Sequence, residues 1–163
     1  MRIGIVCDTH NNLNNIETII SLFNDENVEL VIHAGDIANA KSLDKFSELN
    51  CNLFGVYGNN DRNEKGLNEI AQKNSFNIQE PPHKISIGKR NVAVFHEPDE
   101  IDTFLEENPN IDLVLHGHTH RYREEYINQT LIFNPGECAG IRKGKNAIGV
   151  VDLKDLSVKR IFF

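Results

Sequence analysis

Several features are scarce or missing in this chain of 163 residues. No apolar run approaches the roughly 20 residues that a membrane-spanning helix requires. The three cysteines, Cys7, Cys51 and Cys138, are odd in number and far apart, so a disulfide framework is not expected. Low-complexity tracts, repeats and linker-like stretches are also missing. Because 39% of the residues are hydrophobic, we expect one folded domain over residues 1–163.

Positive charge is in short supply, with 17 Lys and Arg residues against 24 Asp and Glu residues, and a formal net charge of −7. An acidic surface repels a phosphate backbone, so extended nucleic-acid binding is not expected. A small phosphate-containing substrate stays compatible, because bound metal ions can reverse the local field. Residues 1–7 are typical of a first strand rather than a signal peptide, so we expect a cytoplasmic location without membrane association.

Strand and helix patterns alternate in the first half of the chain. Strands are predicted at residues 1–7, 30–33 and 53–57. Each is followed by apolar residues at helical spacing: Ile16, Ile19, Ile20 and Phe23, then Leu43, Phe46 and Leu49, then Leu67, Ile70 and Ala71. The asparagines at positions 11, 12, 14 and 15 are cap candidates for the first helix, and Ser42 is one for the second.

The second half is richer in strands. They are predicted at residues 84–87, 91–95, 113–116, 124–127, 131–133, 147–153 and 157–163. Pro98, followed by two acidic residues, predicts one more helix opening, with Ile101, Phe104 and Leu105 on the apolar face. Alternating strands and helices followed by many strands predict an α/β fold with two sheets and outer helices.

Polar side chains follow five of the predicted strands. They are Asp8 and His10, Asp36, Asn59 and Asp61, His96, and His118 and His120. Groups just past the carboxyl ends of parallel strands converge at one edge of a sheet. Imidazole suits transition metals, and a carboxylate can bridge two hard divalent ions. Glycines at 35, 58 and 117 allow close approach of the backbone. The sequence therefore predicts a two-metal hydrolytic site.

These fragments resemble the calcineurin-like metallophosphoesterase superfamily, in particular its small bacterial and archaeal phosphodiesterase branch. The matching segments are Asp8-Thr9-His10, Gly35-Asp36, Gly58-Asn59-Asn60-Asp61, His96 and Gly117-His118-Thr119-His120. The resemblance implies a four-layer α-β-β-α sandwich of two mixed sheets with outer helices. It also implies one metal held by Asp8, His10, Asp36 and His120, and a second held by Asp36, Asn59, His96 and His118.

The resemblance further implies a metal-dependent phosphodiesterase acting on small phosphodiesters through a hydroxide that bridges two divalent ions. Manganese is favoured, with nickel, iron, zinc and magnesium as alternatives. The implied catalytic group comprises Asp36, Asn59, Asn60 and Asp61. Asp61 is also a candidate partner for the second ring nitrogen of a ligand histidine. Asn60 and Arg62 are the candidate substrate contacts.

The chain departs from the family pattern at Cys7, where serine is common and a small packing change is expected, and at two positions that could touch the substrate. Asn60 stands where many members have a histidine that assists the leaving group, and an amide cannot supply a proton near neutral pH. We therefore expect rates to depend steeply on the leaving-group pKa. Glu137 follows Asn134-Pro135-Gly136, where serine is frequent, which argues against a phosphate contact there.

Other candidate residues have an ordinary structural interpretation. His33 and His116 lie within apolar runs and are expected to be hydrogen-bonded core residues, whereas His83 is expected to be exposed. Cys138 is expected to be a buried small residue rather than a nucleophile. A basic turn of Arg142, Lys143 and Lys145 is expected to be solvated, with attraction of a phosphate as the alternative.

Three functional alternatives stay open. A phosphomonoesterase could use the same site, a non-catalytic scaffold like the retromer member of the superfamily could use the same fold, and a DNA nuclease is disfavoured by the acidic charge. The oligomeric state is open, with a homodimer as one alternative.

Overall fold

The structure is a computed structural model that describes residues 1–142 and 144–163. Lys143 of the expected basic turn lies outside the described residues. The strands of one sheet are β1 (Arg2–Val6), β2 (Leu30–Ala34), β3 (Asn52–Val56), β4 (Asn77–Gln79), β10 (Ala147–Asp152) and β11 (Ser157–Phe162). Those of the other are β5 (His83–Ile87), β6 (Arg90–Val94), β7 (Leu113–Leu115), β8 (Arg123–Ile127) and β9 (Thr130–Asn134). The helices are α1 (Leu13–Asp25), α2 (Ala40–Lys45), the 3-10 turn η1 (Phe46–Glu48), α3 (Leu67–Lys73) and α4 (Ile101–Glu107).

Both sheets are mixed. The six-stranded sheet has the order β11-β10-β1-β2-β3-β4, and the run from β1 to β4 is parallel. The five-stranded sheet has the order β5-β6-β7-β9-β8, in which β6, β7 and β9 are parallel. Every strand that the sequence predicts is present. The short edge strand β4 was not predicted, because its three residues carry no apolar run or alternation that marks a strand.

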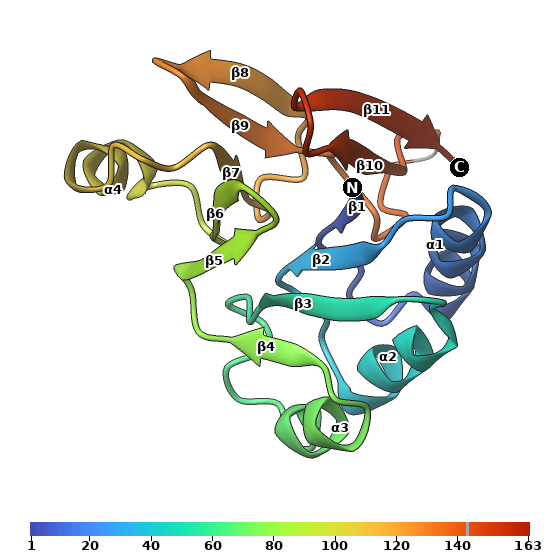
Figure 1. Cartoon of the computed structure of the whole chain (residues 1–163). Helices are drawn as coiled ribbons and strands as arrows, with labels where there is room; N and C mark the ends of the chain where they lie inside the picture. Colours follow the sequence, from blue (N-terminus) through green and yellow to red (C-terminus); the bar gives the residue numbers. More distant parts are fainter. Residues whose placement is uncertain (143) are drawn as a thin grey trace.

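The two sheets pack face to face with helices on both outer sides (Figure 1). Alternate residues of β1 and β2, such as Ile3 and Ile32, face Val94, Leu115 and others of the second sheet in one buried cluster. The opposite faces of β1 to β3 pack against α1, α2 and α3 in a second cluster. The helix α4 covers the other sheet through a third cluster that includes Phe95 and Ile101. This arrangement is the expected four-layer α-β-β-α sandwich.

Local capping interactions fix where the first two helices begin. Asn12 caps α1 by accepting a hydrogen bond from the N–H of Asn15 at 3.2 Å, so one of the four asparagine candidates is confirmed. The expected cap of α2, Ser42, is wrong. The cap is Asn39, whose side chain accepts from the N–H of Ser42 at 2.9 Å, so Ser42 lies inside the helix.

The helix predicted after Pro98 begins at Ile101. The carbonyl of Pro98 accepts from the N–H of Ile101 at 3.2 Å, so the proline belongs to the turn that leads into α4. Its apolar face is as predicted, because Phe104 and Leu105 pack with buried Ile101 against the second sheet.

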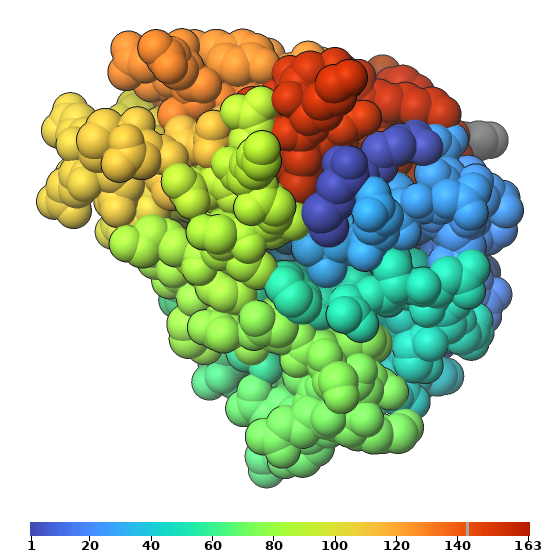
Figure 2. Space-filling model, in the orientation of Figure 1, coloured from blue at the N-terminus to red at the C-terminus, as the bar shows by residue number. Residues whose placement is uncertain are grey.

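The three cysteines are free, as expected. No helix among residues 1–142 and 144–163 is both long and apolar enough to cross a bilayer. In the space-filling view, the last strands, in red, lie against the first strand, in blue, consistent with the antiparallel pairing of β1 and β10 (Figure 2). The two ends of the chain are thus joined in one sheet.

Candidate metal centre

Each predicted ligand lies just past the carboxyl end of a strand. Asp8 and His10 follow β1, Asp36 follows β2, Asn59 follows β3, His96 follows β6, and His118 and His120 follow β7. Because β1, β2 and β3 are parallel neighbours, as are β6 and β7, their carboxyl ends gather along one edge of the sandwich. We call this the carboxyl edge.

The backbone at this edge is held in an unusual conformation. Ten non-glycine residues of the described chain have positive φ, and half of them are predicted ligands. Those five are Asp8 at 51°, His10 at 47°, Asp36 at 59°, His118 at 65° and His120 at 53°. A non-glycine residue in the left-handed region is uncommon, and such residues cluster at functional sites. The clustering indicates that the fold constrains these side chains for a role other than stability.

Two glycines allow the loops of the carboxyl edge to approach one another. A Cβ atom at Gly58 would collide with the carboxylate and the backbone nitrogen of Asp36. A Cβ atom at Gly117 would lie 2.8 Å from Oδ2 of Asp8 and 2.8 Å from Cβ of Cys7. The predicted need for close approach at these positions is therefore confirmed.

Two groups of ligand atoms come together at this edge. Asp8, His10 and His120 place one ligand atom each within 4.8 Å of one another. Nε2 of His120 lies 3.6 Å from Oδ1 of Asp8, and the rings of His10 and His120 stack at 5.6 Å. These three residues belong to the first of the two predicted ligand sets.

The second group combines Asp8 and Asp36 with His96, again within 4.8 Å. Nε2 of His96 lies 3.4 Å from Oδ1 of Asp36 and 2.8 Å from Oδ1 of Asn59. The same amide oxygen lies 3.1 Å from Nδ1 of His118. All seven predicted ligands thus converge, but Asp8 lies closer to the second set than the sequence suggested.

The electrostatics of the site suit a bound cation. Asp8 is fully buried and Asp36 is 2% exposed, so both carboxylates are removed from water. Burial, with a smaller contribution from the Asp36 carboxylate, raises the pKa of Asp8 to about 7. Among the described residues, only histidines come within ion-pair distance of these two carboxylates. Buried like charges without Lys or Arg require neutralisation, and divalent metal ions with oxygen and imidazole ligands supply it.

The histidine His96 is held by an outer hydrogen bond. Its Nδ1 donates to the carbonyl of Ala34 at 2.9 Å, so Nε2, which faces Asp36 and Asn59, is the nitrogen placed to act as a ligand. Asp61, expected to be such an outer partner, has a different role. Its carboxylate accepts hydrogen bonds from the backbone N–H groups of Ile37, Ala38 and Gly58 at 2.7–3.2 Å. Asp61 therefore ties the loop after β2 to the loop after β3, and its expected pairing with a histidine is wrong.

The two candidate substrate contacts differ in their surroundings. Asn60 donates from its backbone N–H to Oδ1 of Asp36 at 3.0 Å and from its side chain to Oδ2 at 2.7 Å. It therefore orients the Asp36 carboxylate. Arg62 is exposed and lies 3.8 Å from Glu97, beside a hollow of about 220 Å³ that His96 also lines. Substrate contact by either residue stays a prediction.

Two histidines beneath the site are buried, as expected, but only partly hydrogen-bonded. Nε2 of His33 lies 2.9 Å from the Thr9 hydroxyl, and Nδ1 of His116 lies 3.0 Å from the carbonyl of Gly117. Their other ring nitrogens have no partner among the described residues, which corrects the expectation of fully bonded core histidines. Burial lowers the pKa of His33 to about 3 and that of His116 to about 4. The third, His83, is half-buried in β5 rather than exposed.

Residues that the sequence did not assign to the site surround His120. Glu137 is 2% exposed, and its carboxylate accepts hydrogen bonds from the N–H groups of Ile141 and Arg142. Arg160 and Tyr122 complete a hollow beside His120. The glutamate after Pro135-Gly136 was a visible signal, whereas Arg160, next to the end of the chain, gave none.

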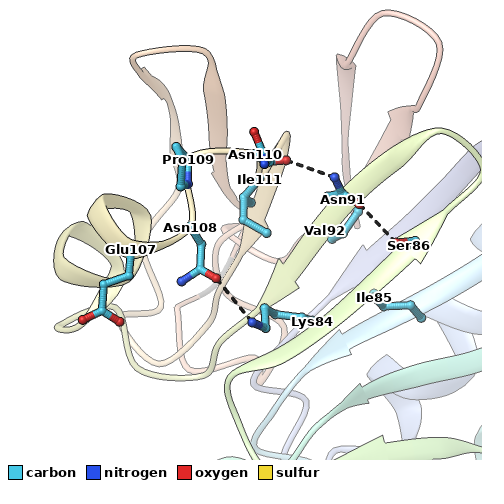
Figure 3. Close-up of a pocket in the computed structure, with 10 residues that line it drawn as sticks. All are labelled: Lys84, Ile85, Ser86, Asn91, Val92, Glu107, Asn108, Pro109, Asn110 and Ile111. Atoms are coloured by element: carbon cyan, nitrogen blue, oxygen red, sulfur yellow. Dashed lines mark hydrogen bonds between the residues drawn. The ribbon is translucent and has the colours of Figure 1, made fainter.

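A separate hollow of about 300 Å³ lies at the amino ends of β6 and β7, the opposite ends of these strands from the metal centre (Figure 3). Lys84 Nζ donates to Asn108 at 3.3 Å, and Asn91 donates to the carbonyl of Asn110 at 3.1 Å. These four residues are thus bonded in pairs across the hollow. We call this end of the sandwich the amino edge.

Comparison with known proteins assigns the chain to a family. Its sequence matches the calcineurin-like phosphoesterase superfamily domain over residues 1–156, nearly the whole chain. The protein therefore belongs to the calcineurin-like phosphoesterase superfamily.

Individual relatives and solved structures agree with this assignment. Phosphodiesterase MJ0936 of Methanocaldococcus jannaschii is 36% identical over 163 residues, covering 99% of this chain and 98% of the relative. Phosphodiesterase YfcE of Escherichia coli is 26% identical over 178 residues, covering 97% and 91%. A solved structure described as a novel archaeal phosphodiesterase has a TM-score of 0.90 and 35% identity, and the match covers 100% of both chains.

The fold extends to more distant proteins. The structure of Vps29 from Entamoeba histolytica in complex with Zn²⁺ has a TM-score of 0.69 at 14% identity, covering 100% of this chain and 98% of the other. At that identity the likeness concerns the fold alone.

Proposed function

We propose that this protein is a metal-dependent phosphodiesterase that hydrolyses small phosphodiesters at a dinuclear centre on the carboxyl edge. The observation that carries the proposal is the convergence of two buried carboxylates, Asp8 and Asp36, with the imidazole of His10 from the loop of Asp8 and with imidazoles from two other segments. Relatives that align over nearly the whole chain, at 36% and 26% identity, are named phosphodiesterases. The geometry of the site and the comparison with relatives both concern the segments that follow the strands at the carboxyl edge.

The proposed roles of the chain's own residues follow from their positions. Asp8, His10 and His120 would hold one divalent ion, and Asn59, His96 and His118 the other, with Asp36 shared between them. Asn60 would keep both oxygens of Asp36 in place through its two hydrogen bonds. Asp61 would position the loops that carry Asp36 and Asn59. When bound, the ions would supply a water of lowered pKa and neutralise charge on the phosphoryl oxygens.

The first test is metal analysis of the purified protein, followed by chelation and add-back of Mn²⁺, Ni²⁺, Fe²⁺, Zn²⁺ or Mg²⁺. We expect hydrolysis of bis(p-nitrophenyl) phosphate to disappear on chelation and to return with added metal, most strongly with manganese. The same assay with p-nitrophenyl phosphate tests the monoesterase alternative, because a monoester would be preferred there. Activity that survives complete metal removal would contradict the proposal.

The amide of Asn60 sets a second expectation. It cannot protonate a departing alcohol, so rates on aryl methyl phosphodiesters should fall steeply as the leaving-group pKa rises. The matched variant is Asn60→His, which should flatten this dependence if the imidazole can act as the missing acid. A flat dependence in the unaltered protein, with chemistry rate-limiting, would remove this role from the proposal.

The remaining expectations go with the proposal. A single domain over residues 1–163, a cytoplasmic location and freedom from extended nucleic-acid binding stay predictions. So does the scaffold alternative, which a protein without metal affinity would favour.

A further inference from the structure

Beside His120, the carboxyl edge opens into a hollow of about 260 Å³. Its lining includes His120, Tyr122, Arg142, Lys145, Arg160 and Phe162. These residues come from the loop after β7, from the segment between β9 and β10, and from β11. Because His120 is also one of the converging metal-type side chains, a molecule bound at the centre can extend directly into this hollow. We call it the His120 hollow.

Arg160 is held in place before any ligand arrives. Its Nε donates to the carbonyl of Pro135 at 2.7 Å. Its guanidinium carbon lies 4.3 Å from the centre of the Tyr122 ring and 4.6 Å from that of Phe162. Two aromatic rings and one carbonyl thus fix the plane of the guanidinium, while its terminal N–H groups stay available as a fork for an oxyanion. Such preorganisation reduces the entropy lost on binding.

The charge of the His120 hollow is positive in an otherwise acidic chain. Arg142, Lys145 and Arg160 have no carboxylate within ion-pair distance among the described residues, and the whole chain has a formal net charge of −7. One acid, Glu137, also lines it. That carboxylate is buried and already accepts hydrogen bonds from the backbone N–H groups of Ile141 and Arg142. The available groups are therefore cationic.

The hollow on the other side of the centre has the opposite character. It adjoins His96 and is lined by Glu97, Asp99 and Glu100, and Arg62 is the one cation among its described lining residues. That cation lies 3.8 Å from Glu97. A substrate arm that carries negative charge is therefore repelled on the His96 side and attracted on the His120 side.

We propose that the His120 hollow binds a second anionic group of the substrate, so that the preferred phosphodiesters carry a further phosphate or carboxylate on one of their two alcohols. This inference rests on the proposed function and names the substrate class of that site. Arg160 binds the anion as a fork, and Arg142 and Lys145 add charge from the exposed rim. All three are specificity-determining residues that act on the substrate arm rather than on the reacting phosphorus.

The test compares p-nitrophenyl phosphodiesters that share one leaving group. The second alcohol is a plain propyl or pentyl chain, the same chain ending in a carboxylate, or the same chain ending in a phosphate. The variants are Arg160→Gln, Arg142→Gln and Lys145→Gln, with Arg160→Lys as the conservative form. Lys89→Gln removes an exposed cation from the β5–β6 turn at the amino edge and is the matched control.

In the unaltered protein, kcat/KM should be at least about tenfold higher for an anion-ended chain than for the plain chain. If the phosphate-ended chain has the higher kcat/KM, the second anionic group is a phosphate. If the carboxylate-ended chain has the higher value, the group is a carboxylate. Each of the three Gln variants should lower this ratio while leaving the plain substrate unchanged, Arg160→Lys should retain part of it, and Lys89→Gln should retain all of it. Equal kcat/KM for the three chain types, or a ratio unaffected by all three Gln variants, would overturn the inference.

A second readout separates this inference from the proposed function. Phosphonate analogues, in which a methylene replaces the ester oxygen to the leaving group, are titrated by calorimetry with and without the terminal phosphate. If no diester is hydrolysed with any metal, the proposed function fails on its own. Anion binding by the His120 hollow would still be supported if the anion-ended analogue binds more tightly than the plain one. This preference should be lost in Arg160→Gln and kept in Lys89→Gln. Equal binding of both analogues would overturn it.

Discussion

The two edges of the sandwich use polar residues in opposite ways. At the amino edge, Arg90 donates to Asp112 at 2.9 Å and to the carbonyl of Leu153 at 3.0 Å, while the N–H of Asn91 donates to Asp112 at 2.8 Å. At the carboxyl edge, Asp8 and Asp36 are buried beside one another on backbone of positive φ. The polar groups are thus bonded to one another at the amino ends of β6 and β7, whereas like charges converge at the carboxyl ends of β1 and β2. The difference supports the proposed function, in which the carboxyl edge loses stability in the metal-free state and gains a site for ions.

The largest effect should come from Asp36→Asn. Losing an outer partner of a ligand already costs about 10–100-fold. Losing Asp36, which the proposed function assigns to both ions, should therefore lower turnover by more than about 100-fold. The metal-free variant should be at least as stable as the original, because one of two buried like charges is removed. Steady-state kinetics and urea unfolding in chelator measure both quantities.

Asp112→Asn at the amino edge is the control for that comparison, and it should leave turnover unchanged. Near-normal turnover in Asp36→Asn would contradict the view that the carboxyl edge serves activity and the amino edge serves stability. A large loss of metal-free stability in the same variant would contradict it as well.

Gly58→Ala should have the next largest effect. The added Cβ has no room beside the carboxylate and backbone nitrogen of Asp36, so the two loops must separate. We expect metal affinity and kcat/KM to fall by about 10–100-fold. The comparison is Gly88→Ala in the β5–β6 turn, where φ is +61° and no described residue beyond the two chain neighbours lies within 4 Å of the new atom. That variant should lose about 1 kcal/mol of stability through backbone strain, with unchanged kcat/KM.

A pH-dependent effect of intermediate size should arise from the buried histidines near the carboxyl edge. Burial lowers the pKa of His116 from 6.5 to about 4, so the unfolded chain binds its proton first as the pH falls. His116 therefore leaves the free energy of unfolding unchanged above about pH 6.5 and lowers it in acid, by about 2 kcal/mol at pH 5. His116→Gln should reduce the loss, measured by urea unfolding of metal-free protein at the two pH values.

Asp8 acts with the opposite sign in the same range. Its raised pKa means that the metal-free folded chain binds the extra proton, so its contribution falls as the pH rises from about 4 to about 7. The contribution of Asp8 is the same in the original protein and in His116→Gln, so it cancels when their stabilities are compared. An equal acid loss in His116→Gln and the original would show that His116 does not titrate in this way.

The smallest effect should come from Asp112→Ala at the amino edge. It removes the partly buried hydrogen bond from Arg90 and the exposed one from the N–H of Asn91, and should cost about 1 kcal/mol of stability. The kinetic parameters should not change. A drop in kcat/KM would mean that the two edges are coupled through the sheets.

Most of the strands were predictable because their apolar runs bury residues on one or both faces of a sheet, as in β2, whose five residues are all buried. The edge strand β4 was not predictable, because β3 holds it by backbone pairing that does not depend on an apolar pattern. The predicted cap of α2 was three residues too late, because both Asn39 and Ser42 are residue types that cap helices well.

The seven candidate ligands were predictable because each stands directly after a strand in the sequence. The role of Asp61 was not, because its carboxylate binds backbone N–H groups of Ile37 and Ala38, on a separate loop. Nor was the His120 hollow, since Tyr122 and Arg160 meet only after β8 and β11 have joined different sheets.

The sequence by itself determined the order of strands and helices and which polar groups stand at the strand ends, because burial patterns and loop residues are local properties of the chain. Only the tertiary structure decided how Asp8 is shared between the two ligand groups, what Asp61 holds, and where the free cations gather. Those features depend on distances between segments far apart in the chain, which are set by strand pairing within each sheet and by packing of the two sheets.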